Sequence, residues 1–319
     1  VKDDIIRRAP HVDLVLGTSN FRSAVQDLHD IDAGGGRVLR TAKRPDPEFL
    51  PDADRNVGAR PDHFRAYVTI MRGCNHACTY CIVPHTRGTE ISRPLEEVLQ
   101  ETRALVDDGV REVTFLGQNI NTYGKDLGEG GLCTLLERAD EIEGLDRIRF
   151  LTSNPFDMTE DMMRRFGQTP KVMPWLHIPA QSGNDDVLKR MKRTFTVAQY
   201  DEVVGWARKH IAGVEITSDF IVGFPGETDE EFEGTRALVE RSDLVQAYIF
   251  KYSVRPRTAS ARRMEDDIPE AVKQQRNEIL HSTQDRISER RNGQMVGRTV
   301  EVLVDGVSKT RDDMLSGRE

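Results

Sequence analysis

The chain lacks several features that would place it in a class of proteins at once. It has only four cysteines in 319 residues, and three of them lie close together. That pattern excludes the evenly spaced disulfide framework of a small secreted domain. No apolar run approaches the roughly 18 residues of a membrane-spanning helix, and the N-terminal stretch VKDDIIRRAP has no apolar signal-peptide core. We therefore expect a cytoplasmic protein without a membrane partner.

An excess of positive charge is also absent. The 45 Lys and Arg residues face 53 Asp and Glu residues, which gives a formal net charge of -8. The overall field does not favour nucleic acid, so any RNA contact would have to come from local basic clusters. Each cluster is also compatible with an ordinary solvated face. The candidates are Arg87, the LKRMKR run at 188–193, and Arg255 with Arg257.

The middle of the chain alternates between strand and helix patterns. Short apolar runs are separated by amphipathic stretches long enough for a helical crossover, which is typical of a parallel α/β sheet. Right-handed crossovers place all strand-to-helix loops on one rim of such a sheet. We therefore predict an open, barrel-like sheet with its chemistry on that rim. The candidate strands are 66–70, 112–116, 148–152, 175–179, 215–223 and 247–253.

The two ends of the chain have different compositions. Residues 1–34 show one strand and one helix pattern, and 35–62 are rich in Gly, Pro, Asp and Arg, as in a linker. After the barrel, predicted at 63–294, residues 295–319 alternate Val300, Val302 and Val304 with polar residues, which predicts a β-type module. Because the sequence starts at Val1, we expect a fragment.

The stretch RGCNHACTYCIVPHTRG holds Cys74, Cys78 and Cys81 directly after the first predicted barrel strand. With His85 as a fourth ligand, the three thiols would form a closed structural zinc site. Alternatively, three thiolates hold a 4Fe-4S cluster and leave one iron without a protein ligand. S-adenosylmethionine can chelate that open iron through its amino and carboxylate groups. A cluster loop on the rim of a barrel favours the second alternative.

Polar loops at later strand ends support the iron-sulfur alternative. LGQNINTYG offers Gly117, Gln118 and Asn119 after the second strand, where glycine permits close approach and the amides suit an amino group. Gln181 with Ser182 follows the fourth strand, and the fifth carries Asp219. Each loop alone is a weak signal, but together they predict one binding rim.

These motifs resemble those of the radical S-adenosylmethionine methylthiotransferases. GCNHACTYC carries the CxxxCxxC signature, and the likeness extends from Tyr67 to about Gln294. VPHTRGTEISRP, FLGQNINTYG, IPAQSGNDDVLKRMKR, DFIVGFPGETDEEF and LSGR are most similar to the MiaB type. The resemblance implies a partial (β/α)6 TIM-like barrel, preceded by the end of an N-terminal α/β domain and followed by the start of a TRAM β-module.

The resemblance also implies roles for individual residues. The three cysteines of the signature would hold the 4Fe-4S cluster, and no protein acid or base would be catalytic, because the chemistry belongs to the cofactor. A second cluster is expected in the full-length protein, so this chain should be incomplete for sulfur insertion. The S-adenosylmethionine pocket would comprise Tyr80, Gly117, Gln118, Asn119, Gln181, Ser182, Asp219 and Val222, and RNA would contact Arg87, Arg255 and Arg257.

The implied reaction adds a methylthio group to carbon 2 of N6-isopentenyladenosine beside the anticodon of tRNA. Related enzymes of the family act on threonylcarbamoyladenosine of tRNA or on a ribosomal-protein aspartate, and both remain alternatives. A zinc-stabilised RNA-binding module is the non-enzyme alternative. The expected partners are tRNA and an electron donor such as a flavodoxin or ferredoxin, and the expected state is a monomer.

Overall fold

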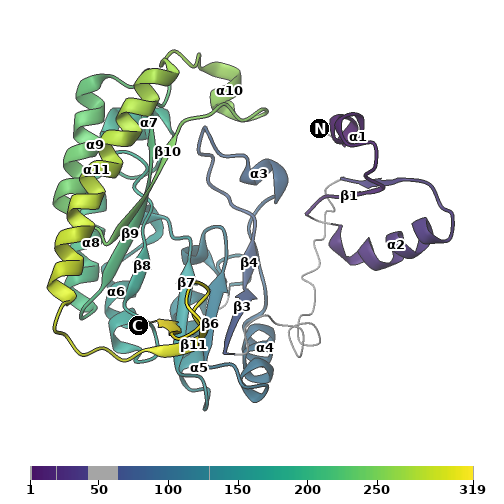
Figure 1. Ribbon diagram of the computed structural model, residues 1–319, viewed down its shortest axis with the longest axis horizontal. Helices are drawn as coiled ribbons and strands as arrows, with labels where there is room; N and C mark the ends of the chain where they lie inside the picture. The colour runs from purple at the N-terminus through teal and green to yellow at the C-terminus, as the bar shows by residue number, and fades with distance from the viewer. Residues whose placement is uncertain (1, 19, 42–63, 129, 319) are drawn as a thin grey trace.

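The computed structural model describes residues 2–18, 20–41, 64–128 and 130–318. In this part of the chain, six parallel strands form an open partial barrel (Figure 1). Three pair in the order β3-β6-β7 and three in the order β8-β9-β10, and the bridge between Ile148 and Val172 joins the two groups. The predicted architecture is confirmed. The strands are β3 (Arg65–Thr69), β6 (Glu112–Leu116), β7 (Arg147–Leu151), β8 (Trp175–His177), β9 (Glu215–Val222) and β10 (Gln246–Lys251).

Helices cover the outer face of the partial barrel and leave its inner face open (Figure 1). The apolar core lies between strands and helices, and Val68, Phe115 and Phe220 are fully buried there. Burying such side chains contributes about 1.5–3 kcal/mol each. The helices are α4 (Leu95–Asp107), α5 (Gly131–Asp140), α6 (Glu160–Gln168), α8 (Val197–His210), α9 (Asp229–Ser242) and α11 (Glu270–Met295).

Local sequence signals explain where several helices begin. Thr196 and Thr228 are the N-caps of α8 and α9, and each forms a capping box with the residue three positions on, Gln199 or Glu231. Helix α4 buries Val98, Leu99 and Leu105 on one face, as its spacing predicts. The capping boxes therefore fix the residues at which α8 and α9 begin.

The inner face of the sheet is polar and accessible. Along β10 exposed and buried residues alternate, and Tyr248 remains 43% exposed on the inner side. Its ring meets that of His177 edge-on at 6.0 Å, and Tyr67 on β3 is 59% exposed. An ion pair of 3.1 Å joins Arg149 to Glu112 on this face. The inner face thus carries polar side chains and partly exposed aromatic rings rather than a packed apolar core.

Short elements form the rim of the barrel, where the predicted chemistry lies. Strands β4 and β5 pair antiparallel and bracket the loop that contains the three clustered cysteines. These short elements are β4 (Met71–Arg72), α3 (Val83–Thr86), β5 (Ile91–Ser92), η2 (Ile120–Thr122), η3 (Pro155–Asp157), α7 (Asp185–Arg190) and α10 (Ala259–Arg263).

The N-terminal residues form a small unit in which β1 and β2 pair in parallel. The side chains of Phe21 in η1 and of Val25 and Leu28 in α2 are exposed. Strand β2 lies inside the range predicted as linker, and residues 42–62 of that range lie outside the described part of the chain. The elements are α1 (Lys2–Arg8), β1 (Leu14–Leu16), η1 (Phe21–Ser23), α2 (Ala24–Asp32) and β2 (Val38–Arg40).

The C-terminal residues form an antiparallel hairpin of β11 (Leu303–Val307) and β12 (Leu315–Arg318). Val300 and Val302, predicted in a strand, precede β11 instead. The Arg147 guanidinium donates to the backbone oxygen of Arg318 at 2.8 Å and so ties the hairpin to β7.

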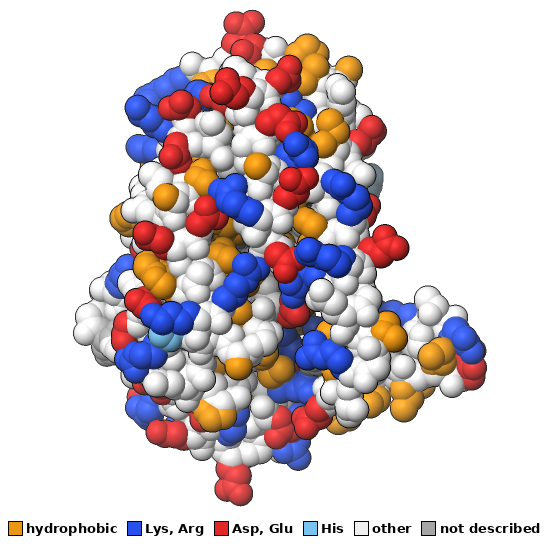
Figure 2. Space-filling view, turned by 90° about the vertical axis from the view of Figure 1, so that its left-hand side faces the viewer, with side chains coloured by type: hydrophobic (Ala, Val, Ile, Leu, Met, Phe, Trp, Pro, Cys, Tyr) orange, Lys and Arg blue, Asp and Glu red, His pale blue; other side chains and the backbone are white. Residues whose placement is uncertain are grey.

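Acidic and basic side chains are interspersed on the face that α9 and α11 cover (Figure 2). Several of them pair, such as Arg236 with Glu240 at 2.7 Å. Among the described helices, none combines the length and apolarity that a membrane crossing requires.

Candidate functional site

The three clustered cysteines lie in residues 73–90, which we call the cysteine loop. It begins at Gly73, whose φ is +78° and where a Cβ atom would lie 1.9 Å from the Thr89 oxygen, so only glycine fits. The amide of Cys74 donates to the Gly88 oxygen at 3.2 Å, and that of Cys81 donates to the Cys78 oxygen at 3.1 Å. The backbone thus folds back on itself around the thiols.

All three thiols are free and half-buried. Burial raises the pKa of the Cys74 thiol to about 11 and also raises the pKa of Cys81. A metal must therefore displace these protons to bind, as it does at thiolate sites generally. The donor set, three half-buried thiols on one strongly folded loop, fits an iron-sulfur cluster held by thiolates.

A single-ion site fits less well. In the described ranges, no three His, Cys, Asp or Glu side chains are grouped to hold one metal ion. His85, the fourth ligand in the zinc alternative, is exposed at the end of α3. The three cysteines and His85 therefore do not form the closed four-ligand site that the zinc alternative requires. In a 4Fe-4S cluster each thiolate binds its own iron, so the thiols need not converge on one point.

The loop after β6 packs against the start of the cysteine loop. The Gly73 amide donates to Gln118 Oε1 at 2.6 Å. At Gly117 a Cβ atom would lie 2.6 Å from Met71 Cγ, so glycine is needed for this close approach. Gln118, predicted to meet a ligand, thus has a protein partner, and its contact with S-adenosylmethionine stays a prediction.

Asn119 joins a polar cluster that the sequence did not predict. Its Nδ2 donates to Asp157 Oδ2 at 3.0 Å and lies 3.1 Å from His76 Nε2. Its Oδ1 is buried without a hydrogen-bond partner in the described part of the chain. Such an atom is costly unless a ligand or water meets it. Asn119 therefore remains a good candidate to contact a bound molecule.

Asp157 is the buried acid of this cluster. Burial alone would raise the pKa of its carboxyl, but hydrogen bonds from His76 and Asn119 hold the pKa at about 2. Lys125 Nζ lies 3.3 Å from its other oxygen. The only sequence signal for Asp157 was its place in the polar loop SNPFD after β7.

A cavity of about 510 Å³ opens beside Cys81. Three predicted pocket residues, Tyr80, Gln181 and Asp219, contribute to its wall. Gln181 has a φ of +70°, a strained value for a residue other than glycine and one often found at binding sites. The lining residues are Tyr80, Cys81, Gln181, Asp219, Ile221, Phe250, Lys251, Tyr252, Ser253, Arg255 and Glu270.

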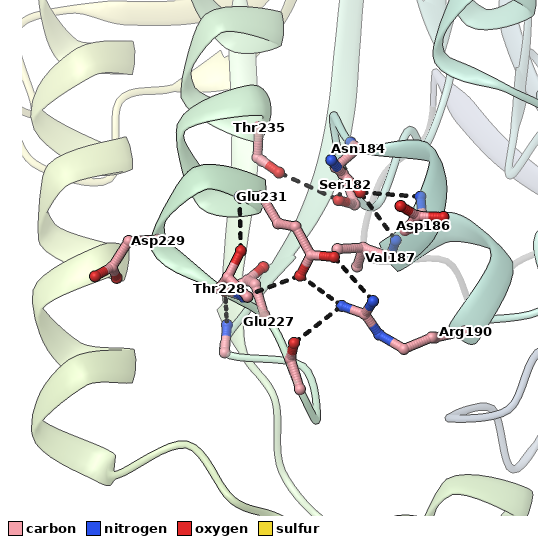
Figure 3. Close-up of polar contacts among 12 residues, drawn as sticks. Ser182, Asn184, Asp186, Val187, Arg190, Glu227, Thr228, Asp229, Glu231 and Thr235 are labelled. Carbon is pink, nitrogen blue, oxygen red and sulfur yellow. Dashed lines mark hydrogen bonds and ion pairs between the residues drawn. The ribbon is translucent and has the colours of Figure 1, made fainter.

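The other five predicted pocket residues do not line this cavity. Gly117, Gln118 and Asn119 lie in the loop after β6 described above, and Ser182 and Val222 lie elsewhere. Ser182 is buried, and its Oγ contacts Thr235 Oγ1 at 3.2 Å on α9 (Figure 3). Val222 is fully buried in the core, and its neighbour Ile221 faces the cavity instead. Successive residues of a strand point to opposite faces, so a shift of one residue changes the side.

The loop after β9 is held by matched charges. We call residues 223–228 the proline loop. Glu227 is buried and pairs with Arg276 at 2.7 Å, and its Oε2 also accepts from the Gly223 amide at 2.7 Å. Behind the loop, Arg190 meets both oxygens of Glu231 at 2.9 and 2.7 Å (Figure 3). Arg190 is therefore a structural residue and not part of a solvated basic face.

The three candidate RNA-binding arginines are all exposed. Arg87 caps α3 at the end of the cysteine loop, and Arg255 with Arg257 follows β10. Arg255 also lines the cavity next to Cys81. The structure thus places Arg87 and Arg255 on the rim that carries the thiols.

Comparisons with known proteins agree with this geometry. The radical SAM superfamily model matches residues 68–239. The chain is 43% identical to the tRNA-2-methylthio-N(6)-dimethylallyladenosine synthase of Rhodopirellula baltica, over 98% of this chain and 67% of that protein. It is 44% identical to the enzyme of the same name from Moorella thermoacetica, over 100% of this chain and 71% of that protein.

Solved structures show the same fold at lower identity. The radical S-adenosylmethionine methyltransferase TsrM from Kitasatospora setae, with cobalamin and a [4Fe-4S] cluster bound, aligns with a TM-score of 0.57 at 16% identity, over 77% of this chain and 54% of that one. Coproporphyrinogen III oxidase from Escherichia coli aligns with a TM-score of 0.54 at 19% identity, over 75% and 55%. The chain therefore belongs to the radical SAM superfamily and, within it, to the MiaB-type tRNA methylthiotransferases, whose cofactors are a 4Fe-4S cluster and S-adenosylmethionine.

Proposed function

We propose that this enzyme acts on carbon 2 of N6-isopentenyladenosine beside the anticodon of tRNA. The observation that carries the proposal is the accessible, aromatic inner face of the barrel next to the cavity at Cys81. Tyr248 and Phe250 on β10 are 43% and 53% exposed, and Tyr67 on β3 is 59% exposed. Exposed rings at a rim are the usual platforms for an unstacked base. Relatives at 43–44% identity are named as tRNA-2-methylthio-N(6)-dimethylallyladenosine synthases, a name that states the product expected from this substrate.

The residues around the thiols have separate proposed roles. Cys74, Cys78 and Cys81 hold the cluster, and Tyr80, Gln181 and Asp219 form one wall of the S-adenosylmethionine pocket. Asn119 offers its unpartnered oxygen to the amino group, while Gln118 and Gly117 keep the cysteine loop in place. When bound, the two cofactors supply a carbon radical that removes hydrogen from an unactivated carbon, which no side-chain base can do.

The remaining contacts concern RNA and electrons. We propose that Arg87, Arg255 and Arg257 contact the tRNA backbone, because all three are exposed and Arg255 lines the cavity beside Cys81. The donor is a flavodoxin or ferredoxin, the protein acts as a monomer in the cytoplasm, and residues 63–294 form its radical domain. Residues 1–34 and 295–319 belong to a methylthiotransferase domain and a TRAM domain.

We further propose that this chain performs hydrogen removal without sulfur insertion. A second cluster of the kind that the family resemblance implies would need three more thiols. The remaining cysteine, Cys133, is buried in α5. It cannot serve that purpose alone.

The test uses tRNA whose N6-isopentenyladenosine carries deuterium at carbon 2. After anaerobic incubation with the reconstituted protein, S-adenosylmethionine and a reductant, mass spectrometry follows the deuterium. We expect it in 5'-deoxyadenosine, with no 2-methylthio nucleoside. Parallel reactions contain tRNA with threonylcarbamoyladenosine or the ribosomal protein. Deuterium-free 5'-deoxyadenosine, or reaction with a parallel substrate alone, would overturn the proposed substrate.

A further inference from the structure

Arg193 occupies an unexpected position beside the cysteine loop. It belongs to the LKRMKR run, whose sequence suggested a basic patch, but its guanidinium points into the site. Its Nη1 donates to Cys78 Sγ at 3.5 Å, and its Nη2 lies 3.2 Å from the Pro179 oxygen and 3.3 Å from Asn154 Oδ1. The Phe195 ring lies 4.9 Å below it. The side chain is therefore fixed on four sides.

No carboxylate in the described part of the chain forms an ion pair with Arg193. All its hydrogen-bond acceptors in the described residues are neutral groups: a carbonyl, an amide and a thiol. Arg190, three positions earlier, does have a counter-charge, because it donates hydrogen bonds to both carboxylate oxygens of Glu231. A desolvated guanidinium without a counter-charge is unfavourable, so a negative group in contact with it would stabilise this arrangement.

The sulfur beside Arg193 supplies that group once it is a cluster ligand. A thiolate is a charged acceptor, and hydrogen bonds to the sulfurs of iron-sulfur clusters tune their reduction potentials. Reduction adds one electron and thus one negative charge to the cluster. A nearby fixed cation stabilises the reduced form more than the oxidised form, which raises the potential.

We propose that Arg193 is a positioning residue that donates a charge-assisted hydrogen bond to the Cys78 thiolate and raises the reduction potential of the cluster. This inference rests on the proposed role of Cys78 as a cluster ligand. Arg193 requires no contact with the tRNA, and its effect is therefore present in the protein alone.

The test is an anaerobic potentiometric titration followed by electron paramagnetic resonance. The reconstituted chain is compared with R193Q, R193K and K189Q. Lys189 is exposed on α7, so K189Q removes the same charge without touching the sulfur. We expect a lower potential for R193Q, an intermediate potential for R193K and an unchanged potential for K189Q. The titration reports only assembled clusters, so partial loss of iron does not obscure the result.

Equal potentials for R193Q and the unsubstituted chain would overturn the inference while leaving the cluster assignment intact. Should R193Q bind no iron, R193K decides: a lowered potential supports the inference, and an unchanged one overturns it. A shift in K189Q as large as that in R193Q would show only a long-range charge effect and would also overturn it. If the unsubstituted chain forms no cluster, the proposed function itself fails.

Discussion

The cysteine loop and the proline loop lie on the same rim but differ in how their charges are matched. In the proline loop the buried Glu227 pairs with Arg276 at 2.7 Å, and the nearby Glu231 pairs with Arg190. Beside the cysteine loop, the hydrogen-bond acceptors of Arg193 among the described residues are all neutral groups. The proline loop therefore pairs its buried cation with a carboxylate of the protein, whereas the described residues around the cysteine loop supply no carboxylate to Arg193.

The largest difference between the loops should come from removing a thiol. Cys78→Ala leaves the cluster with two thiolates, so we expect iron content to fall and 5'-deoxyadenosine formation to drop to background. Cys133→Ala is the matched control, because that thiol is buried in α5 away from the loop. Iron analysis and chromatography of the products measure both effects. Full activity in the Cys78 variant would remove it from the ligand set.

The proline loop should respond in stability instead. Glu227→Gln leaves the Arg276 charge buried without its main partner, and we expect a loss of about 3 kcal/mol in the free energy of unfolding. Glu233→Gln is the control, because its pair with Arg236 is exposed and should change stability by less than about 0.5 kcal/mol. Urea unfolding gives both values. Similar effects for the two variants would show that the buried pair has no special role.

The shifted pKa of Asp157, beside the cysteine loop, predicts that the free energy of unfolding depends on pH. The folded-state pKa of Asp157 is about 2, below the ordinary 3.8, so its stabilising effect is complete above pH 3.8 and is lost as the pH falls toward 2. Asp157→Asn should remove about 2 kcal/mol at neutral pH and flatten this acid limb. Asp285→Asn, an exposed site on α11, should leave the limb unchanged. An unaltered acid limb in the Asp157 variant would contradict the assignment.

The smallest expected effect concerns RNA at the rim. Reversing the charges of Arg255 and Arg257 to glutamate should weaken tRNA binding and reduce the salt dependence of the affinity, with the log-log slope falling by about 1 per lost phosphate contact. Arg103→Glu, on the outer helix α4, provides the control. Binding isotherms over a range of salt test this. Identical slopes for all proteins would remove both arginines from the RNA contact surface.

The sequence predicted the parts of the site that depend on local pattern. The six strands, the rim position of the thiols and the capping boxes of α8 and α9 follow from periodicity and short motifs. The contact between Arg193 and Cys78 joins residues 115 positions apart, and a basic run gives no sign of which charge turns inward. Val222 and Ile221 could not be separated either, because both sides of β9 are apolar near its end.

The most direct test of the account is electron paramagnetic resonance of the reduced, reconstituted chain with and without S-adenosylmethionine. If the cysteine loop leaves one iron open, the cofactor binds it, the signal of the reduced cluster changes, and 5'-deoxyadenosine forms. Uptake of zinc in place of iron, with no cluster signal and no response to the cofactor, would show that the cysteine loop does not hold a 4Fe-4S cluster with an open iron.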